Sequence, residues 1–162
     1  MKMFIILFFK IWVAIFTQDQ YKSDTDKIYE TILSIYNKKV LLEKNTSIET
    51  IKRFDFKNPS SHELRVDKIL SSDWQSFLNS VDTSNFRPCI LDASIRKQYI
   101  QHGNTNLKSL ILSPVILSND KFKAVCAVSI YGSPEDAGEQ VYLLEKKDGK
   151  WIIIKYYMLS IS

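Results

Sequence analysis

The chain is poor in the residues on which common catalytic motifs depend. Its 162 residues include four glycines, two cysteines and two histidines. None of the glycines forms the GxGxxG or GxxxxGK spacing in which backbone amides hold a phosphate, and there is no HExxH metal motif and no nucleophile elbow. The composition therefore argues against nucleotide chemistry. We expect a protein that is not an enzyme and that needs no cofactor.

Strong charge of one sign is also missing. The chain has 22 basic and 18 acidic residues, and the first seventeen positions contain two of the lysines and no acid. Without these positions the net charge is +2, and basic and acidic side chains are interleaved along most of the chain. A nucleic-acid surface needs a one-sided basic patch. We therefore expect no nucleic-acid partner.

The N-terminus has the layout of a secretory signal peptide. Residues 1–17, MKMFIILFFKIWVAIFT, place a short basic start ahead of an apolar run. Lys10 interrupts this run, which is already too short for a membrane span. We expect cleavage after Thr17, a mature chain of residues 18–162 without a transmembrane span, and a place in the periplasm or outside the cell. An uncleaved N-terminal anchor is the alternative.

Two cysteines, Cys89 and Cys126, leave a disulfide open. An exported protein can oxidise two such thiols if the fold brings them together. Cys126 lies in FKAVCAVSIY, where alternation places it on the apolar face of a strand, and a small buried thiol also fits that position. A Cys89–Cys126 disulfide and two free thiols are both compatible with the sequence.

Helical periodicity marks two segments of the chain clearly. Segment 23–39 repeats apolar residues on one helical face, namely Ile28, Ile32, Ile35 and Tyr36. Segment 71–81 has the same periodicity, and Ser72 with Gln75 forms the pattern of a capping box at its start. Both segments are predicted to be amphipathic helices.

Three further segments ahead of the C-terminal third give weaker signals. Segment 92–103 is expected to be a helix that begins after Asp92 and ends at Gly103. Residues 40–43 predict a short strand. Residues 46–70 fit either a helical turn or a strand.

The period changes from helical to extended in the last third of the chain. Residues 109–118, SLILSPVILS, contain Pro114, which lacks an amide donor and therefore predicts an edge strand or a bulge. Residues 121–131 predict the next strand. Residues 140–158 predict a hairpin, because Asp148-Gly149 suits the positive φ angles of a type I′ turn.

A two-residue turn at Asp148-Gly149 predicts the register of this hairpin. The expected pairs are Lys146 with Trp151, Leu143 with Ile154, and Val141 with Tyr156. Both faces of the hairpin are then apolar, and the stem of Lys146 lies across the Trp151 indole. Helices on one face with a pocket or a partner on the other would explain this, and so would helices on both faces.

Together these elements predict one α+β domain at residues 18–162. The N-terminal helices are expected to pack on a C-terminal antiparallel β-meander that forms a curved sheet. No internal repeat, low-complexity tract or linker divides the chain.

The C-terminal third carries a group of motifs. A strand that ends in Ser118 precedes the turn Asn119-Asp120-Lys121, residues 144–151 read LEKK-x-GKW, and the chain ends in Ser162. This group resembles an uncharacterised family of small exported proteins from Bacteroidetes-type bacteria, and residues 73–78, DWQSFL, are similar to the family's Trp-x-x-Phe helix. The resemblance implies a fold pattern and no chemistry. The paired cysteines of the family's loop are missing from YGSPEDAGEQ.

The expected architecture has a second likeness. A helix packed on a curved antiparallel sheet is similar to the cystatin-like and nuclear-transport-factor-like folds. This is a likeness of architecture, and it implies no function.

Three acids gather in the loop YGSPEDAGEQ, residues 131–140, between two predicted strands. Glu135, Asp136 and Glu139 offer the oxygen ligands that calcium prefers, but their spacing is not that of an EF-hand. Proline and glycine with charged residues are also the usual composition of a solvated turn. A metal site and an ordinary turn are therefore the two interpretations.

A cysteine–histidine pair is the nucleophilic site that this composition allows. Cys89 with His62 or His102, oriented by Asp92, would form it. Nothing around these residues matches a thiol-enzyme motif, and both histidines lie in polar stretches typical of a surface. A hydrolase that uses His102 or the acidic loop is the least supported hypothesis.

The first hypothesis is a non-enzymatic exported protein that binds a partner protein or a component of the cell envelope. It depends on the signal peptide, the missing catalytic motifs and the two-sided apolar hairpin. The alternative is a carrier of a small apolar ligand, with a pocket between the first helix and the curved sheet. The ligand-binding residues would be Tyr142, Leu144, Trp151 and Tyr157.

Overall fold

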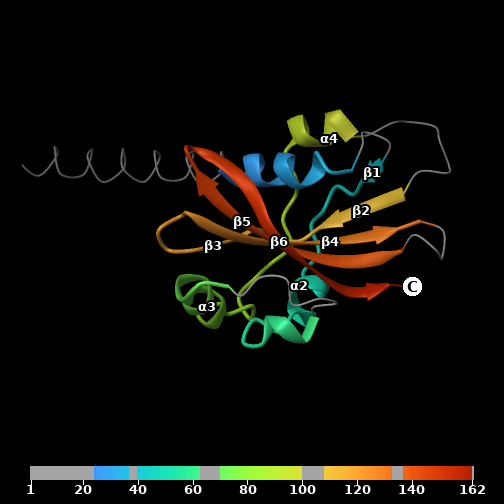
Figure 1. Cartoon of the computed structure of the whole chain (residues 1–162). Coiled ribbons are helices and arrows are strands. Elements are labelled where there is room, and N and C mark those ends of the chain that lie inside the picture. Colours follow the sequence, from blue (N-terminus) through green and yellow to red (C-terminus); the bar gives the residue numbers. More distant parts are fainter. Residues whose placement is uncertain (1–23, 37–39, 63–69, 100–107, 133–136, 162) are drawn as a thin grey trace, which may run out of the picture.

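A six-stranded, mostly antiparallel sheet forms the centre of the protein (Figure 1). The structure is a computed structural model that describes residues 24–36, 40–62, 70–99, 108–132 and 137–161. Most of the strands follow the helices in the chain, which confirms the predicted α+β class with a C-terminal antiparallel meander.

The sheet is built around three long strands. β4 (Lys123–Tyr131), β5 (Gly138–Lys147) and β6 (Lys150–Ile161) follow one another as an antiparallel meander. β2 (Lys108–Leu112) pairs antiparallel with β4, and β1 (Val40–Leu42) lies parallel to β2. The spatial order β1-β2-β4-β5-β6 places β1 and β6 at the two edges.

Pro114 marks the point where one strand is interrupted. β2 ends at Leu112, and β3 (Ile116–Leu117) resumes the pairing with β4. Ser113 closes the gap, since its backbone N–H donates to Ala127 O at 2.8 Å and its hydroxyl oxygen accepts the Ala127 N–H at 2.8 Å. β2 has neighbours on both sides, whereas β3 pairs with β4 alone. The predicted edge or bulge at the proline is confirmed.

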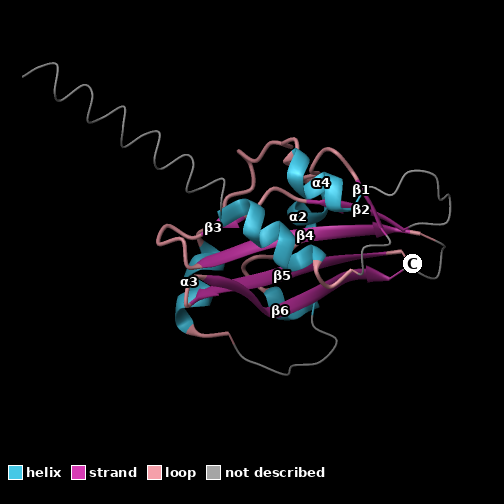
Figure 2. Cartoon of the chain, turned by 90° about the horizontal axis from the view of Figure 1, so that it is seen from above, coloured by secondary structure: helices cyan, strands magenta, loops and turns pink. Residues whose placement is uncertain are grey.

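Helices cover both faces of the sheet (Figures 1 and 2). The N-terminal helix (residues 24–33) and α4 (Ala93–Tyr99) lie on one face. α2 (Glu49–Arg53), the 3₁₀ turn η1 (Pro59–His62) and α3 (Ser72–Asn79) lie on the other. The apolar character of both hairpin faces is thus explained by helices on both sides.

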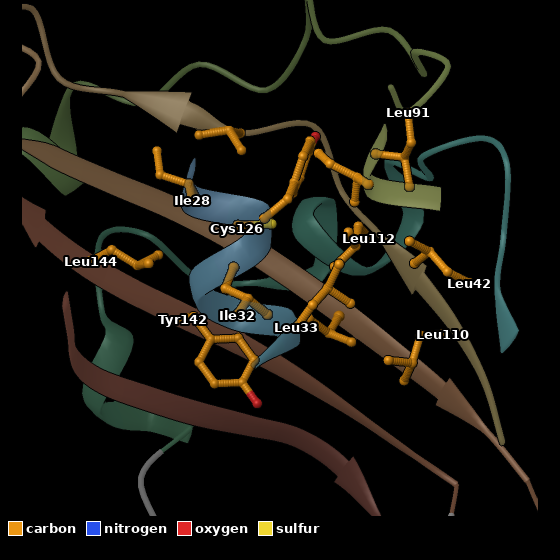
Figure 3. Close-up of a cluster of buried hydrophobic side chains, with 14 of the residues drawn as sticks. Ile28, Ile32, Leu33, Leu42, Leu91, Leu110, Leu112, Cys126, Tyr142 and Leu144 are labelled. Carbon is orange, nitrogen blue, oxygen red and sulfur yellow. The ribbon is translucent and has the colours of Figure 1, made fainter. Parts of the chain in front are cut away.

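The first core lies between the N-terminal helix, α4 and the sheet (Figure 3). Ile28, Ile32 and Leu33 of the helix are fully buried there. Burying each of these side chains stabilises the fold by about 1.5–3 kcal/mol. Ile35, which the helical period places on the same face, is exposed, because the helix ends at residue 33 and residues 34–36 form a turn. The sheet side of this core includes Leu110, Leu112, Cys126, Tyr142, Leu144 and Trp151.

The second core lies on the opposite sheet face. It is formed by α2 and α3 with the chain between them. Residues 46–70, which fit either a helical turn or a strand from the sequence, are helical at α2. Trp74 and Leu78 of α3 are buried, as the periodicity of segment 71–81 predicts. The sheet contributes Val125, Ala127, Val141, Leu143 and Tyr157.

The sequence predicts a capping side chain at the start of both α3 and α4, and the structure has only the one at α4. α4 begins as expected, because the Asp92 carboxylate accepts bonds from the Ser94 N–H at 2.7 Å and the Ser94 hydroxyl at 2.6 Å. The prediction of a capping box formed by Ser72 and Gln75 is wrong. Ser72 is already the first residue of α3, and the Gln75 side-chain amide donates instead to the carbonyl of Leu70 at 3.2 Å.

The hairpin is regular close to its turn. Asp148 and Gly149 have φ angles of 49° and 75°, the positive values of the predicted type I′ turn. Lys146 faces Trp151, as expected from the two-residue turn. The register up to Leu144 is therefore the predicted one.

A β-bulge changes the register further from the turn. Leu144 still faces Ile153, but Leu143 faces Lys155, so Ile154 is an extra residue in β6. The predicted pairs Leu143 with Ile154 and Val141 with Tyr156 are therefore wrong. Beyond the bulge, Tyr157 faces Val141 and belongs to the second core, and Tyr156 faces Tyr142. A shift of one residue moves a side chain to the opposite face of a sheet.

A buried ion pair joins the N-terminal helix to the hairpin. The Lys146 Nζ lies 2.9 and 3.0 Å from the two carboxylate oxygens of Asp24, and the Trp151 indole N–H donates to the same carboxylate at 3.4 Å. The ammonium is also 5.7 Å from the centroid of the Trp151 ring, the contact that the hairpin register predicts. Asp24 is only 3% exposed, and among the described residues the Lys146 ammonium supplies the counter-charge of its carboxylate while the Trp151 indole adds a hydrogen bond.

Replacing Lys146 should therefore destabilise the protein. Lys146→Met leaves the buried Asp24 carboxylate without its counter-charge, and we expect a loss of about 2–3 kcal/mol in the free energy of unfolding, measured by urea denaturation. The control is Lys147→Met, because its pair with Glu145 at 3.0 Å is largely exposed and should contribute less than about 0.5 kcal/mol. Equal losses in the two variants would contradict this role of the ion pair.

Candidate functional site

Polar and aromatic side chains gather where the N-terminal helix meets β5 and β6. Tyr36 belongs to the turn that follows the helix. Gln140 and Tyr142 are alternate residues of β5 and point to the same face of the sheet. Tyr156 faces Tyr142 from β6, a position that it reaches only because of the bulge at Ile154. We call Tyr36, Gln140, Tyr142 and Tyr156 the tyrosine cluster.

Three polar groups of the tyrosine cluster contact one another. The hydroxyl oxygens of Tyr36 and Tyr142 are 2.5 Å apart, and the Tyr36 hydroxyl donates to Gln140 Oε1 at 2.9 Å. The Tyr142 hydroxyl also bonds to Gln140 Oε1. The rings of Tyr142 and Tyr156 are 6.0 Å apart between centroids and tilted by 36°. Tyr142 is buried, whereas Tyr156 is 56% exposed.

The tyrosine cluster is electrically neutral. Burial raises the pKa of Tyr36 above the ordinary tyrosine value, and the neighbouring Tyr142 adds to the shift. Burial likewise raises the pKa of Tyr142. Among the described residues, the other groups that influence these two pKa values are Tyr156 and Cys126. Both hydroxyls therefore keep their protons at neutral pH.

A second polar group lies on the opposite face, centred on Glu139. The Glu139 carboxylate is ion-paired with Arg53 and accepts hydrogen bonds from the hydroxyls of Thr50 at 3.1 Å and Ser160 at 3.3 Å. Thr50 in turn bonds to the Ser129 hydroxyl. These contacts hold α2 against β4 and β5, and the Ser160 bond joins β6 to β5. A buried carboxylate with this set of partners serves to fix the structure.

The predicted metal site is not supported at Glu139. This residue lies within β5, buried against Thr50 and Arg53, and not in a solvated loop. Glu135 and Asp136 lie outside the described residues. Among the residues that the structure describes, no three histidine, cysteine, aspartate or glutamate side chains come together in a way that could hold a metal ion.

The four predicted ligand-binding residues do not line one pocket. Tyr142, Leu144 and Trp151 are buried in the first core, where the N-terminal helix packs directly on them. Tyr157 is buried in the second core, on the other side of the sheet. Tyr157 and Tyr142 therefore lie on opposite faces of the sheet, because the bulge at Ile154 changes the register of β6.

Cys89 and Cys126 are both free thiols, so the disulfide considered from the sequence is not formed. Cys126 is completely buried in the first core, whereas Cys89 is exposed with its Sγ 3.5 Å from the Thr46 hydroxyl. The nearest partner of Cys89 is thus a threonine. His102 and the side chain of His62 lie outside the described residues, and Asp92 caps α4.

Comparison of the whole chain with protein-family models, with curated proteins and with solved structures finds no match. The family resemblance and the architectural likenesses drawn from the sequence therefore stay predictions. In the described part of the chain, no helix combines the length and the apolar composition that crossing a membrane requires.

Sequence reasoning missed most of the tyrosine cluster. Tyr142 was predicted as a ligand-binding residue, but Tyr36 was assigned only to a helix face and Gln140 was given no role. The alternation of Gln140 and Tyr142 along β5 is visible in the sequence and could have suggested that they share a face. The position of Tyr156 could not be foreseen, because it depends on the bulge.

The two thiols should differ sharply in reactivity. Burial raises the pKa of the Cys126 thiol to about 12, and thiolate is the reactive form. We expect that an aromatic disulfide reagent at pH 8 modifies one thiol of the native protein quickly and the second only in denaturant. Cys89→Ser should remove the fast reaction. Fast modification of both thiols in the native protein would contradict the burial of Cys126.

The tyrosine cluster should also make the protein sensitive to alkali. A raised pKa in the folded state means that the contribution to stability is full below the ordinary pKa of tyrosine, about 10, and is lost as the pH rises above it. We expect the free energy of unfolding to fall above about pH 10, and to fall less in Tyr36→Phe. The control is Tyr131→Phe at an exposed position. An equal alkaline loss in Tyr36→Phe and wild type would contradict the assignment.

Proposed function

We propose that the protein is a non-enzymatic exported module that binds a component of the cell envelope through the surface around the tyrosine cluster. The observation that carries this proposal is the exposure of Tyr156. An aromatic ring that is 56% exposed stands beside a network of fixed hydroxyl and amide groups. Such a combination of one apolar platform with a few positioned polar groups is typical of recognition sites.

The covering of the sheet on both faces supports a surface site over an internal one. The side chains that would line a pocket beneath the N-terminal helix are packed against Ile28, Ile32 and Leu33. A ligand carrier would need that space. Binding at the rim of the first core, where Tyr156 meets solvent, requires no rearrangement of the core.

Export is supported by the sequence. Residues 1–17 have the basic start and apolar run of a signal peptide. A protein delivered to the periplasm or to the outside of the cell meets envelope components there. A binding role without catalysis also agrees with the scarcity of catalytic motifs in the chain.

A capture experiment tests the proposed function. The immobilised protein is exposed to solubilised envelope material from its own cells, and bound material is identified by mass spectrometry of proteins and of released sugars. We expect enrichment by wild type and a loss of most of it in Tyr156→Ala. The control is Phe122→Ala, because Phe122 is equally exposed at 56% but lies in the turn between β3 and β4. No enrichment over a blank matrix would count against the proposal.

A further inference from the structure

We infer that the tyrosine cluster is the binding site for a neutral oligosaccharide. The inference rests on the proposed function and names the ligand class of the same surface. It depends on three properties of the cluster within the described part of the chain: a fixed side-chain amide whose nitrogen has no hydrogen-bond partner, an exposed aromatic ring beside it, and no charged side chain bonded to the polar groups of the cluster.

The side-chain amide of Gln140 is the fixed polar group. Its Oε1 contacts the hydroxyls of both Tyr36 and Tyr142, which hold the carboxamide in one place. No described residue bonds the amide nitrogen, and Gln140 is only half-buried. The amide group therefore offers its two N–H donors to a ligand without first losing side-chain freedom.

Counting protons shows that turning the carboxamide replaces its two free N–H donors with one free tyrosine donor. Tyr36, Tyr142 and Gln140 Oε1 form a triangle of three contacts, but the two hydroxyls supply only two protons. When the carboxamide turns by 180°, its two N–H groups donate to the two hydroxyl oxygens and one tyrosine proton becomes available to a ligand. In either orientation the network offers polar hydrogen-bonding groups to an external hydroxyl.

The exposed ring of Tyr156 provides the apolar platform. It lies 6.0 Å from the Tyr142 ring and on the same side of the sheet as Gln140. A sugar ring presents polarised C–H groups on its faces and hydroxyls on its rim, which match an aromatic face and adjacent amide groups at the same time. A purely apolar ligand would leave the Gln140 amide without a partner.

The surroundings of the cluster favour a ligand without charge. Among the described residues, the hydroxyls of Tyr36 and Tyr142 and the Gln140 side-chain amide form hydrogen bonds only with one another, and Tyr156 and Cys126 are the other groups that act electrostatically on the two tyrosines. The adjacent carboxylate, Glu139, points to the opposite face and is ion-paired with Arg53. An anionic or cationic ligand would therefore lose hydration at the cluster without gaining a counter-charge.

An extended peptide that adds a strand to β6 is the less favoured occupant. Register shifts make Ile154 and Leu159 extra residues of β6, so the regular stretch between them is only residues 155–158. Bulges of this kind, together with a lysine such as Lys155, are the usual means by which an edge strand avoids further pairing. The geometry thus favours a compact ligand over a β-strand.

Calorimetric titration tests the inference directly. The probes are cellotetraose and tetra-N-acetylchitotetraose as neutral oligosaccharides, with tetragalacturonate as the anionic comparison. We expect the wild-type protein to bind at least one neutral probe and to bind the anionic probe at least about tenfold more weakly. Tyr156→Ala and Gln140→Leu should each weaken binding of the neutral probe about tenfold, whereas Phe122→Ala should leave it unchanged.

A second measurement locates the binding on the wild-type protein and uses a variant only to assign one resonance. The side-chain amide resonance of Gln140, identified by its loss in Gln140→Leu, should shift in NMR spectra on titration with the neutral probe. No binding of either neutral probe, an unshifted amide, or full affinity in Tyr156→Ala would overturn the inference. If envelope proteins are still captured while the probes fail, the proposed function stands and the ligand class is wrong. Failure of both experiments overturns both.

Discussion

The extra residue at Ile154 determines which side chains of β6 face each of the two cores. Before the bulge, the side chains of β6 alternate between the two cores in the register that the turn imposes. After it, Tyr157 is turned into the second core and Tyr156 to the side of the N-terminal helix. The bulge therefore completes one core and at the same time places an aromatic ring at the rim of the other. Without it, Tyr156 and Tyr157 would exchange faces.

The two layers of helices limit the places on this protein where a ligand can bind. On one face the ion pair of Asp24 with Lys146 holds the start of the N-terminal helix, and on the other Glu139 holds α2 through Arg53 and Thr50. Both carboxylates are buried, and each contact holds a helix against the sheet. The polar groups of the tyrosine cluster lie instead at the rim of the first core, where Tyr36 follows the N-terminal helix and contacts Gln140 and Tyr142 of β5.

Much of the fold was predictable because local chemistry and tertiary structure agree. Pro114 lacks a donor and interrupts its strand, and Asp148-Gly149 accepts positive φ angles and forms the turn. The bulge was not predictable for a physical reason. Residues 151–154 and 156–159 of β6 are all apolar or aromatic, so either register buries a suitable side chain and alternation has no contrast to detect. The place of Tyr156 in the candidate site was missed for the same reason, since it depends on the register.

The features that protect β6 also shape the candidate site. An edge strand that is regular over its whole length would offer its backbone to any extended chain. The register shifts at Ile154 and Leu159 break that regularity, and the stretch between them carries Tyr156 beside Gln140. A surface that resists strand addition but presents one ring and one fixed amide discriminates by ligand shape and polarity. For the binding that we propose, irregular pairing at the edge of the sheet is thus a condition and not a defect of the fold.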